Sequence, residues 1–460
     1  MKRICLVLAA ALSFTDVSNA AARPHYGGTV RVEMRGSLSS FDIVPDVNGS
    51  RALLRDVLLR GVCDRMVTID DNGSPRPSLA ASWRWENEGR AWHFTLRDGV
   101  AMQNGTMLTP QIAANALSAQ NPSWHVQVNA KDLIIQSETP ISGILYELAK
   151  SRNSICIAGT DGRWIGSGPF AISDFRPGQY VDLQAFDDSW QGRPFVDRIH
   201  ILMGRPLADQ VNDFQLGRAD VIEGDPTQPR PTSTSAAMFT RPIEVIALVF
   251  NANHASVADQ KIRAAIAHAI DRNSIYSVLL RRQGEPSAAL LPEWISGYAH
   301  LFNAPQDIGT AARLRNQVQS LAPLSLSYDS NDNLAQLIGE RVSLNARDAG
   351  ITLQARPESP MFRSFDADVR LVRVRIEASD PASALNSIGD IFDNAALQKA
   401  DSTRSGDGLF TAENDVLRDY SIIPIAQIPE AFVLAPIVHD WKSGIAGDVD
   451  LGSLWIEATK

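Results

Sequence analysis

Hydrophobic residues recur at every second position in several short stretches of the chain, and this alternation predicts β-strands. The first stretch, residues 28–34, reads Gly-Thr-Val-Arg-Val-Glu-Met. Residues 82–96 contain two aromatic strands around a turn at 87–90, which we expect to pack a small sheet. Further strands are predicted at 170–173, 180–183, 199–203, 324–328, 351–355 and 368–376, and the apolar run 244–250 predicts a buried strand.

Hydrophobic spacing of three and four residues predicts helices between these strands. Four are expected, over 50–60, from Pro110 after the capping residue Thr109, over 259–280, and over 333–349 with Gly350 as the C-terminal cap. The last of them lies between two predicted strands, and this strand–helix–strand order predicts an α/β lobe with a largely parallel sheet. Residues 225–235 are rich in Pro, Ser and Thr and predict a surface connection.

Length and charge narrow the class of protein. The chain has 460 residues, of which 44% are hydrophobic and 21% charged, which suits one bilobal body or about three compact domains. The net charge is −9 at pH 7, and the sequence contains no run of Lys or Arg that would form a basic segment. Because an acidic protein is repelled by phosphate backbones, we expect no nucleic-acid partner.

Residues 1–22 predict a secretory signal peptide. Lys2 and Arg3 precede an apolar run from Ile4 to Phe14. The small residues at 18–22 match the cleavage site that signal peptidase prefers. The alternative is a membrane anchor, but this run is shorter than the roughly 20 residues that a spanning helix needs. No lipobox precedes Cys5, so we expect a soluble, exported protein without a lipid anchor.

Two cysteines remain after the signal peptide, Cys63 and Cys156. In an oxidising compartment they can form a disulfide. The alternative is a pair of separate buried thiols. The sequence leaves both interpretations open, because it does not give the distance between the two Cα atoms.

The chain lacks the common catalytic motifs. No stretch matches G-x-S-x-G, H-E-x-x-H, G-x-x-x-x-G-K-[ST] or C-x-x-C. The eight histidines are scattered singly, whereas a metal ion needs several converging ligands. We therefore expect no enzymatic activity, no metal site and no cofactor.

Several segments together resemble the extracytoplasmic solute-binding proteins of family 5, the dipeptide, oligopeptide and nickel binding group. They occur in the family's order along the chain and cover 27–32, 77–83 (Pro-Ser-Leu-Ala-Ala-Ser-Trp), 92–100, 104–109, 166–170 (Gly-Ser-Gly-Pro-Phe), 176–178, 190–194, 263–272 (Arg-Ala-Ala-Ile-Ala-His-Ala-Ile-Asp-Arg) and 423–425. Each fragment alone is weak, whereas their joint presence in order is specific.

The resemblance implies a bilobal α/β fold of the periplasmic-binding-protein type II, with a small domain inserted in the first lobe. On this basis lobe I is expected to comprise 23–55, 160–242 and 436–460, the inserted subdomain 56–159, and lobe II 243–435. The lobes are expected to close over a ligand by a hinge motion.

The resemblance also suggests ligand-binding residues. In peptide-binding members an acidic residue four positions before a proline pairs with the α-amino group of the ligand. Asp380-Pro381 supplies that context here, and the matching position is Glu377. The alternative is a solvent-facing Glu at a strand end. The sequence departs from the family at Arg373-Val374, and Arg375 is expected either to bind a ligand carboxylate or to neutralise Glu377.

Other candidates come from the first lobe and from one tryptophan. The loop containing Gly36, Ser37, Leu38 and Ser39 corresponds to the segment whose backbone holds extended ligands in the family, or it is a plain connecting turn. Trp294 either lines the cleft or packs in the core. The stretch between Ile388 and Ala412 is short against the family pattern.

These features predict a periplasmic, monomeric solute-binding subunit that delivers a small peptide or peptide-like solute to an ABC permease and ATPase. A binding protein for another solute class (sugar, opine or metal complex) that serves sensing is the second hypothesis. An exported hydrolase is the third, and it lacks a recognisable nucleophile or metal set.

Overall fold

The structure is a computed structural model. It describes residues 23–43, 49–138, 140–141, 143–224, 236–358, 366–377, 380–398, 405–444 and 447–457. The predicted signal peptide, 1–22, and the predicted surface connection, 225–235, lie outside these residues.

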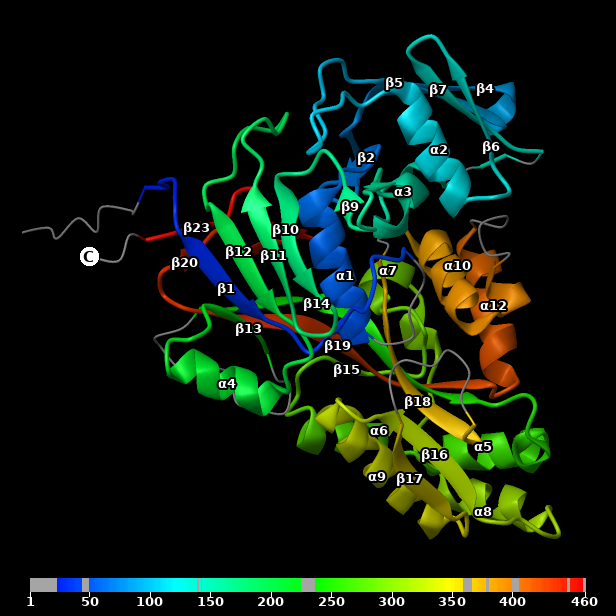
Figure 1. The fold of residues 1–460 in the computed structure, drawn as a ribbon. Coiled ribbons are helices and arrows are strands. Elements are labelled where there is room, and N and C mark those ends of the chain that lie inside the picture. Colours follow the sequence, from blue (N-terminus) through cyan, green and yellow to red (C-terminus); the bar gives the residue numbers. More distant parts are fainter. Residues whose placement is uncertain are drawn as a thin grey trace, which may run out of the picture.

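One mixed sheet passes through both lobes, in the strand order β10-β11-β12-β1-β13-β19-β14-β18-β16-β17 (Figure 1). Lobe I contributes β1 (Thr29–Glu33), β10 (Phe170–Arg176), β11 (Tyr180–Ala185), β12 (Arg198–Leu202) and β13 (Val221–Glu223). Lobe II contributes β16 (Leu324–Asp329), β17 (Leu353–Glu358), β18 (Val369–Arg375) and the short β15 (Glu285–Pro286), which pairs with β19.

Two long antiparallel strands, β14 (Ala236–Phe250) and β19 (Ile422–Leu434), connect the lobes. Their pairing shifts register on both sides of Pro242, which faces Pro429. Proline has no N–H to donate to the ladder, so strand pairing is interrupted at this point. The interruption lies between the half of each strand that pairs in lobe I and the half that pairs in lobe II, and this region is called the hinge below.

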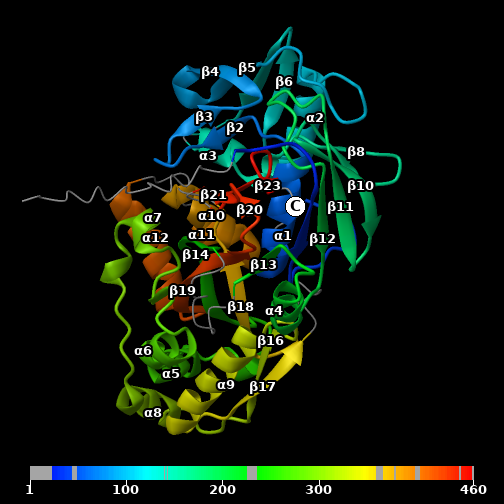
Figure 2. The same cartoon turned by 90° about the vertical axis from the view of Figure 1, so that its left-hand side faces the viewer.

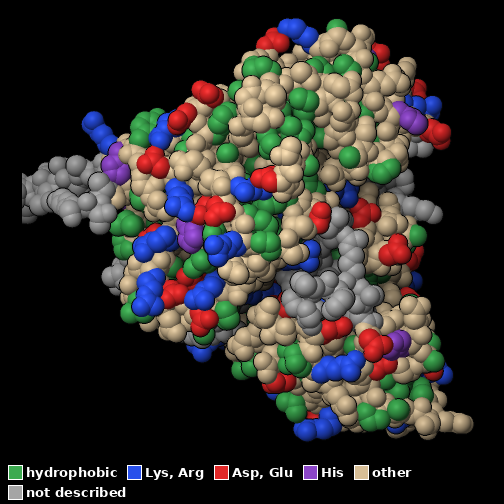
Figure 3. Space-filling view, in the orientation of Figure 1, with side chains coloured by type: hydrophobic (Ala, Val, Ile, Leu, Met, Phe, Trp, Pro, Cys, Tyr) green, Lys and Arg blue, Asp and Glu red, His purple; other side chains and the backbone are tan. Residues whose placement is uncertain are grey.

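The core of lobe I lies between its sheet and α1 (Gly49–Val62), whose residues are nearly all buried. The chain returns to this core at its end, through β20 (Val438–His439), β21 (Lys442–Ser443), β22 (Val449–Asp450) and β23 (Trp455–Ile456). Helix α4 (Leu207–Gln215) precedes β13. Acidic and basic side chains are intermixed on the face formed by this sheet and α4 (Figure 3), as in the pairs Arg198–Asp182 and Arg205–Asp213.

A separate body at the top of Figures 1 and 2 has its own core and sheet. Its sheet has the order β4-β5-β7-β6, and Trp92 and Phe94 of β5 point into the core, whereas Trp85 is 63% exposed. Thr109 caps its helix as predicted, by accepting from Ile112 N at 3.3 Å. Its elements are β2 (Val67–Ile69), β3 (Pro75–Pro77), β4 (Ala80–Glu86), β5 (Ala91–Leu96), α2 (Pro110–Gln120), β6 (His125–Asn129), β7 (Asp132–Gln136) and α3 (Ile144–Leu148).

Lobe II has helices on both faces of its sheet. Val369 and Leu371 of β18 face one core, and Val372 and Val374 face the other, as the two-residue period of a strand requires. The first core contains α5 (Gln260–Ala269) and α9 (Asn333–Asp348), with α8 (Ile308–Asn316) packed on α5. The second contains α7 (Glu293–Ser296), α10 (Pro381–Phe392), α11 (Ala395–Gln398) and α12 (Gly406–Arg418).

Two sequence predictions for this lobe are wrong in part. Among the described strands of this lobe, β16 pairs in parallel with β17 and β18, whereas β14 is antiparallel to both of its neighbours, β18 and β19, so the sheet is not largely parallel. The helix predicted over 259–280 ends at Ala269, because Ile270 is extended and Asp271 caps a new turn by accepting from Ser274 N at 2.9 Å.

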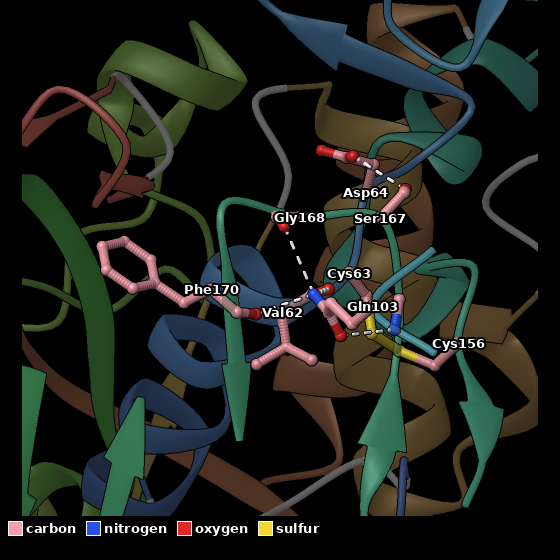
Figure 4. Close-up of a disulfide and its surroundings, with 9 residues drawn as sticks. Val62, Cys63, Asp64, Gln103, Cys156, Ser167, Gly168 and Phe170 are labelled. Atoms are coloured by element: carbon pink, nitrogen blue, oxygen red, sulfur yellow. Dashed lines mark hydrogen bonds between the residues drawn. A yellow bond between two sulfur atoms is a disulfide. The ribbon is translucent and has the colours of Figure 1, made fainter. Parts of the chain in front are cut away.

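Cys63 and Cys156 form a disulfide across 93 residues of sequence, which joins the end of α1 to the strand β8 (Ile157–Ala158) that pairs with β9 (Trp164–Ile165). Beside it, the Gln103 side chain donates to the carbonyl oxygens of Val62 and Phe170, both at 2.7 Å (Figure 4). The disulfide and Gln103 together fix the inserted body to lobe I.

Replacing both cysteines, as Cys63→Ser/Cys156→Ser, should lower the free energy of unfolding by about 2–4 kcal/mol, because the bond closes a long loop in the unfolded chain. Urea unfolding monitored by circular dichroism measures the change. Wild-type protein under reducing conditions serves as the control and should lose a similar amount. An unchanged unfolding midpoint in both samples contradicts the role given to this bond.

A buried glutamate in lobe II should make stability depend on pH. Burial raises the pKa of Glu413 to about 7, although its carboxylate accepts from Leu290 N at 2.6 Å and from Tyr298 Oη at 2.9 Å. The folded state therefore retains a proton that the unfolded state releases above pH about 4.5. This difference lowers stability by about 3 kcal/mol as the pH rises to about 7.

Glu413→Gln removes that titration. We take the free energy of unfolding of the variant minus that of wild type, measured by urea unfolding. This difference should be larger at pH 8 than at pH 5 by up to about 3 kcal/mol, because only the wild type loses stability as the pH rises. Glu340→Gln, an exposed acid on α9, is the control. A difference between Glu413→Gln and wild type that is equal at both pH values rules out this titration.

Candidate functional site

Three small cavities lie where lobe I meets lobe II, and their volumes are about 40, 20 and 20 Å³. Cavity 1 lies between α1, residues 150–152, the end of β18 and α10. Cavity 2 lies between the N-terminus of α1 and residues of β16, α9 and β18. Cavity 3 lies between Arg35, α1 and the hinge part of β14 and β19.

Glu377 and Arg375 both line cavity 1, so the structure brings together two of the predicted site residues. Within the described part of the chain, the Glu377 carboxylate has no hydrogen bond or ion pair, and it acts on Arg375 through its electrostatic field. Asp56 and Arg55 of α1 and Asp390 of α10 line the same cavity. The cavity therefore offers charges of both signs.

Arg375 is fully buried and is bound by groups of the chain itself. Its Nε donates to Glu430 Oε1 at 2.6 Å, and its Nη2 lies 3.0 Å from the Gly447 carbonyl and 3.3 Å from Asp56 Oδ2. Burial by itself would lower the pKa of Arg375, but the carboxylates of Glu430 and Asp56 outweigh it and hold this pKa above its ordinary range.

Arg373 is the centre of a second buried network. It donates to Glu244 at 2.6 Å and to Asp332 at 2.7 Å. Asp332 also lies 3.9 Å from Arg35, which is paired with Glu223 of lobe I at 2.5 Å. Burial would lower the pKa of Arg373, but Asp332 and Glu244 raise it well above its ordinary range. Arg373 and Asp332 belong to lobe II and Arg35 to lobe I, so the network crosses the cleft.

The segment after α3 forms a third contact across the cleft. The Lys150 ammonium, which is 1% exposed, donates to the Ser383 carbonyl at 2.9 Å and to Ser387 Oγ at 2.8 Å, both on α10. Arg152 pairs with Asp390 of the same helix at 2.8 Å. Burial would raise the pKa of Glu147, yet Lys150 and Arg152 lower it to about 2. This carboxylate therefore stays ionised and holds both cations.

The other predicted residues lie apart from cavity 1. Asp380 caps α10 by accepting from Ser383 N at 3.0 Å. Trp294 packs at the hinge, where its Nε1 donates to the Pro242 carbonyl at 2.8 Å. Both have an intramolecular role in the structure, and their roles as ligand contacts stay predictions.

The loop at 36–39 is tied to its own lobe. The carbonyl oxygens of Gly36 and Leu38 accept from Gly204 N at 2.9 Å and from Gly178 N at 2.8 Å, and Leu38 is buried. Gly36 has no room for a side chain, because a Cβ there would lie 2.3 Å from the Ser50 carbonyl oxygen. Ser37 and Ser39 do not line any of the three cavities.

Sequence reasoning missed Asp56, Glu430 and Asp332, which hold the two arginines. Asp56 is an acid within the apolar helix 50–60, and Glu430 is an acid within the apolar strand 422–434. A charged residue on a buried face needs a partner, and that signal was present in the sequence. Among the described residues no group of three or more His, Cys, Asp or Glu is arranged to hold a metal ion. No described helix has the length and apolar character of a membrane span.

Comparison with known proteins identifies relatives. Residues 74–394 match the family model of bacterial extracellular solute-binding proteins, family 5 Middle. The chain is 23% identical over 376 residues to the probable ABC transporter periplasmic-binding protein SapA of Escherichia coli, covering 69% of this chain and 66% of that protein. It is 25% identical over 351 residues to the nickel-binding periplasmic protein of Escherichia coli, covering 65% and 67%. The chain thus spans about two thirds of the length of these relatives.

Solved structures share the fold over nearly the whole chain. NikA from Staphylococcus aureus, in complex with Ni(L-His)2, superposes with a TM-score of 0.83 at 16% identity and covers 93% of this chain and 100% of its own. The oligopeptide-binding protein AppA from Bacillus subtilis, in complex with a nonapeptide, gives a TM-score of 0.81 at 15% identity, with 95% and 100% covered. The bilobal α/β fold predicted from the sequence is confirmed.

A side chain at position 49 should disfavour the closed arrangement of the lobes. A Cβ on Gly49 would lie 1.9 Å from Glu244 Oε1 and 3.3 Å from the Arg373 carbonyl oxygen, and Glu244 can withdraw only by leaving Arg373. Gly49→Ala should raise the free energy of the closed state by about 1–3 kcal/mol. Small-angle X-ray scattering should show a larger radius of gyration.

The matched control is Gly406→Ala, because a Cβ at Gly406 has no atom within 4 Å. It should scatter as wild type does. Indistinguishable scattering from Gly49→Ala and Gly406→Ala refutes the close approach of α1 to lobe II.

Proposed function

Because the chain belongs to the bacterial extracellular solute-binding proteins of family 5, we propose that it is the solute-binding subunit of an ABC importer. It captures a small peptide or peptide-like solute between lobes I and II and delivers it to the membrane permease. Its role is binding and delivery, without a catalytic step. The relatives that it matches include a probable ABC transporter periplasmic-binding protein and a nickel-binding periplasmic protein.

The observation that carries the peptide assignment is the Glu377 carboxylate at cavity 1. A ligand ammonium in a closed cleft loses water and needs an anion in its place. Glu377 is suited to this role because no other group of the described chain pairs with it, while neighbouring acids such as Asp56 and Asp390 are already bonded to arginines.

Capture is a hinge closure. Lobe II, for which we propose residues 243–435, rotates toward lobe I. The boundary predicted between residues 55 and 56 would cut α1, whose residues up to Val62 pack in the core of lobe I together with Cys63. We therefore propose 23–63, 160–242 and 436–460 for lobe I and 64–159 for the inserted subdomain. The interruption at Pro242 and Pro429 allows this motion without breaking either core. The ligand shifts the population toward the closed state because only that state contacts it from both sides.

The proposed location is the periplasm, after cleavage of a signal peptide within residues 1–22. The Cys63–Cys156 bond supports an oxidising compartment, since disulfides persist there and are rare in the cytosol. We propose a monomer, because a single chain supplies both walls of the cleft. The alternative function for the same fold is a binding protein that captures a solute of another class and passes the signal to a sensor.

Native mass spectrometry of the mature protein purified from its host, followed by denaturing release, tests the assignment. The expected result is a set of co-purifying masses that fragment as small peptides or amino-acid derivatives. A released sugar, opine or metal complex refutes the peptide assignment and favours the alternative.

Glu377→Gln should weaken binding of the released peptide about 10- to 100-fold, because the neutral amide forms a weaker hydrogen bond with an ammonium than the carboxylate does. Isothermal titration calorimetry measures the affinity. Asp348→Asn, an exposed acid at the end of α9, is the control and should bind as wild type does. Equal affinity in Glu377→Gln excludes this carboxylate as the ammonium site.

A further inference from the structure

Lys150 places a positive charge of the inserted body against lobe II. Its side chain is 1% exposed and lines cavity 1, which Glu377 also lines. An ammonium group has three N–H donors and no acceptor. Each of the three has a partner here, namely the Ser383 carbonyl at 2.9 Å, Ser387 Oγ at 2.8 Å and Glu147 Oε2 at 2.6 Å. Two of these partners lie on α10 of lobe II, and one lies in the inserted body.

The segment that carries Lys150 is fixed on the other side of the cleft. The turn η2 (Ser151–Asn153) follows Lys150 directly. Ser151 donates to Asp56 of α1, and the buried Asn153 accepts from Asn121 Nδ2 of the inserted body at 2.7 Å. Lys150 is therefore attached to lobe I and the inserted body, whereas two of its three acceptors move with lobe II.

This arrangement couples the burial of a charge to the closing of the lobes. An ammonium is tolerated away from water only when other hydrogen bonds replace its hydration. Glu147 does not supply them alone, because its carboxylate also accepts from Arg152 Nε at 2.7 Å. Arg152 in turn pairs with Asp390 of α10 at 2.8 Å. The Lys150 ammonium is thus fully bonded without water only while α10 lies against it.

We propose that Lys150 is the latch of the closed state, meaning that its two bonds to α10 hold lobe II in place and must break before the cleft opens. This inference rests on the proposed hinge closure. Helix α10 begins at Pro381, four residues after Glu377, so the latch also fixes the segment that carries the proposed ammonium site. Lys150 is a positioning residue, since it acts on a solute only through the position of α10.

Chemical acetylation measures how often the latch is released. The folded mature protein is treated with N-hydroxysuccinimidyl acetate, and mass spectrometry gives the rate for each lysine. Lys131 and Lys442, whose side chains are 69% and 65% exposed, are references within the same molecule. Lys150 should react at least tenfold more slowly than either, because only the open state exposes it. Equal rates for Lys150 and Lys131 overturn the latch.

Ser387→Ala removes one acceptor on α10 and leaves Lys150 in place as the reporter. The acetylation rate of Lys150 relative to Lys131 should rise about tenfold, because a hydrogen bond to a charged group is lost. Ser320→Ala, at an exposed serine outside α10, is the matched control and should leave the rate unchanged. A folded Ser387→Ala protein with the wild-type rate contradicts the proposal.

Lys150→Met retains the apolar stem of the side chain but removes its donors, and Lys150→Met/Glu147→Gln also avoids leaving an acid without its lysine. Both should enlarge the radius of gyration in small-angle X-ray scattering. Lys131→Met, at the exposed lysine of the same inserted body, is the matched control and should scatter as wild type does. Circular dichroism checks that each variant is folded.

Gly49→Ala separates failure of the latch from failure of hinge closure. If Gly49→Ala enlarges the radius of gyration and the folded Lys150 variants do not, the latch is overturned and closure is retained. If none of these variants changes the radius, closure is overturned, and the latch with it. If neither Lys150 variant folds, the acetylation rates of wild type and Ser387→Ala decide.

Discussion

The burial of two guanidinium groups between the lobes is the constraint on which the rest of the site depends. Arg373 and Arg375 lie on the same side of β18 as Val369 and Leu371, but beyond the point where α9 covers that face. A buried charge is tolerated only with bonded partners. The partners come from both lobes, namely Asp332, Glu244 and Glu430 from lobe II and the hinge, and Asp56 from α1. These buried charges are therefore all paired only when the two lobes lie in one particular relative orientation.

Other features of the fold make this contact between lobe I and lobe II possible. Helix α1 can approach lobe II because position 49 has no side chain. Its far end is fixed by the disulfide at Cys63, so the inserted body follows lobe I and brings Lys150 onto α10. The two prolines that interrupt β14 and β19 localise the motion between the lobes. In the proposed closure the lobes move as rigid bodies about this hinge, and the end point is set by ion pairs that are not exposed to solvent.

Local signals in the sequence gave most elements correctly, and long-range contacts explain where they did not. The alternation at 368–376 identified β18, and Thr109 and Gly350 identified helix ends, because these depend on neighbouring residues alone. The break after Ala269 has a local signal in the capping residue Asp271, and the hydrogen bond from Arg272 to the Pro424 carbonyl, 152 residues away, adds a contact that neighbouring residues do not reveal. Glu377 and Arg375 were placed at one cavity by resemblance to a family, whereas Asp56 and Lys150 were not found, since their partners lie in the other lobe.

The most direct test of this account is the distance between the lobes in solution. Site-specific labels near Leu216 of lobe I and Leu301 of lobe II, both well exposed, allow single-molecule energy transfer to be recorded with and without the solute released from host-purified protein. The account predicts two populations, with the shorter distance favoured by the solute and disfavoured by Gly49→Ala. A single distance that responds to neither the solute nor the substitution would contradict closure as the basis of capture.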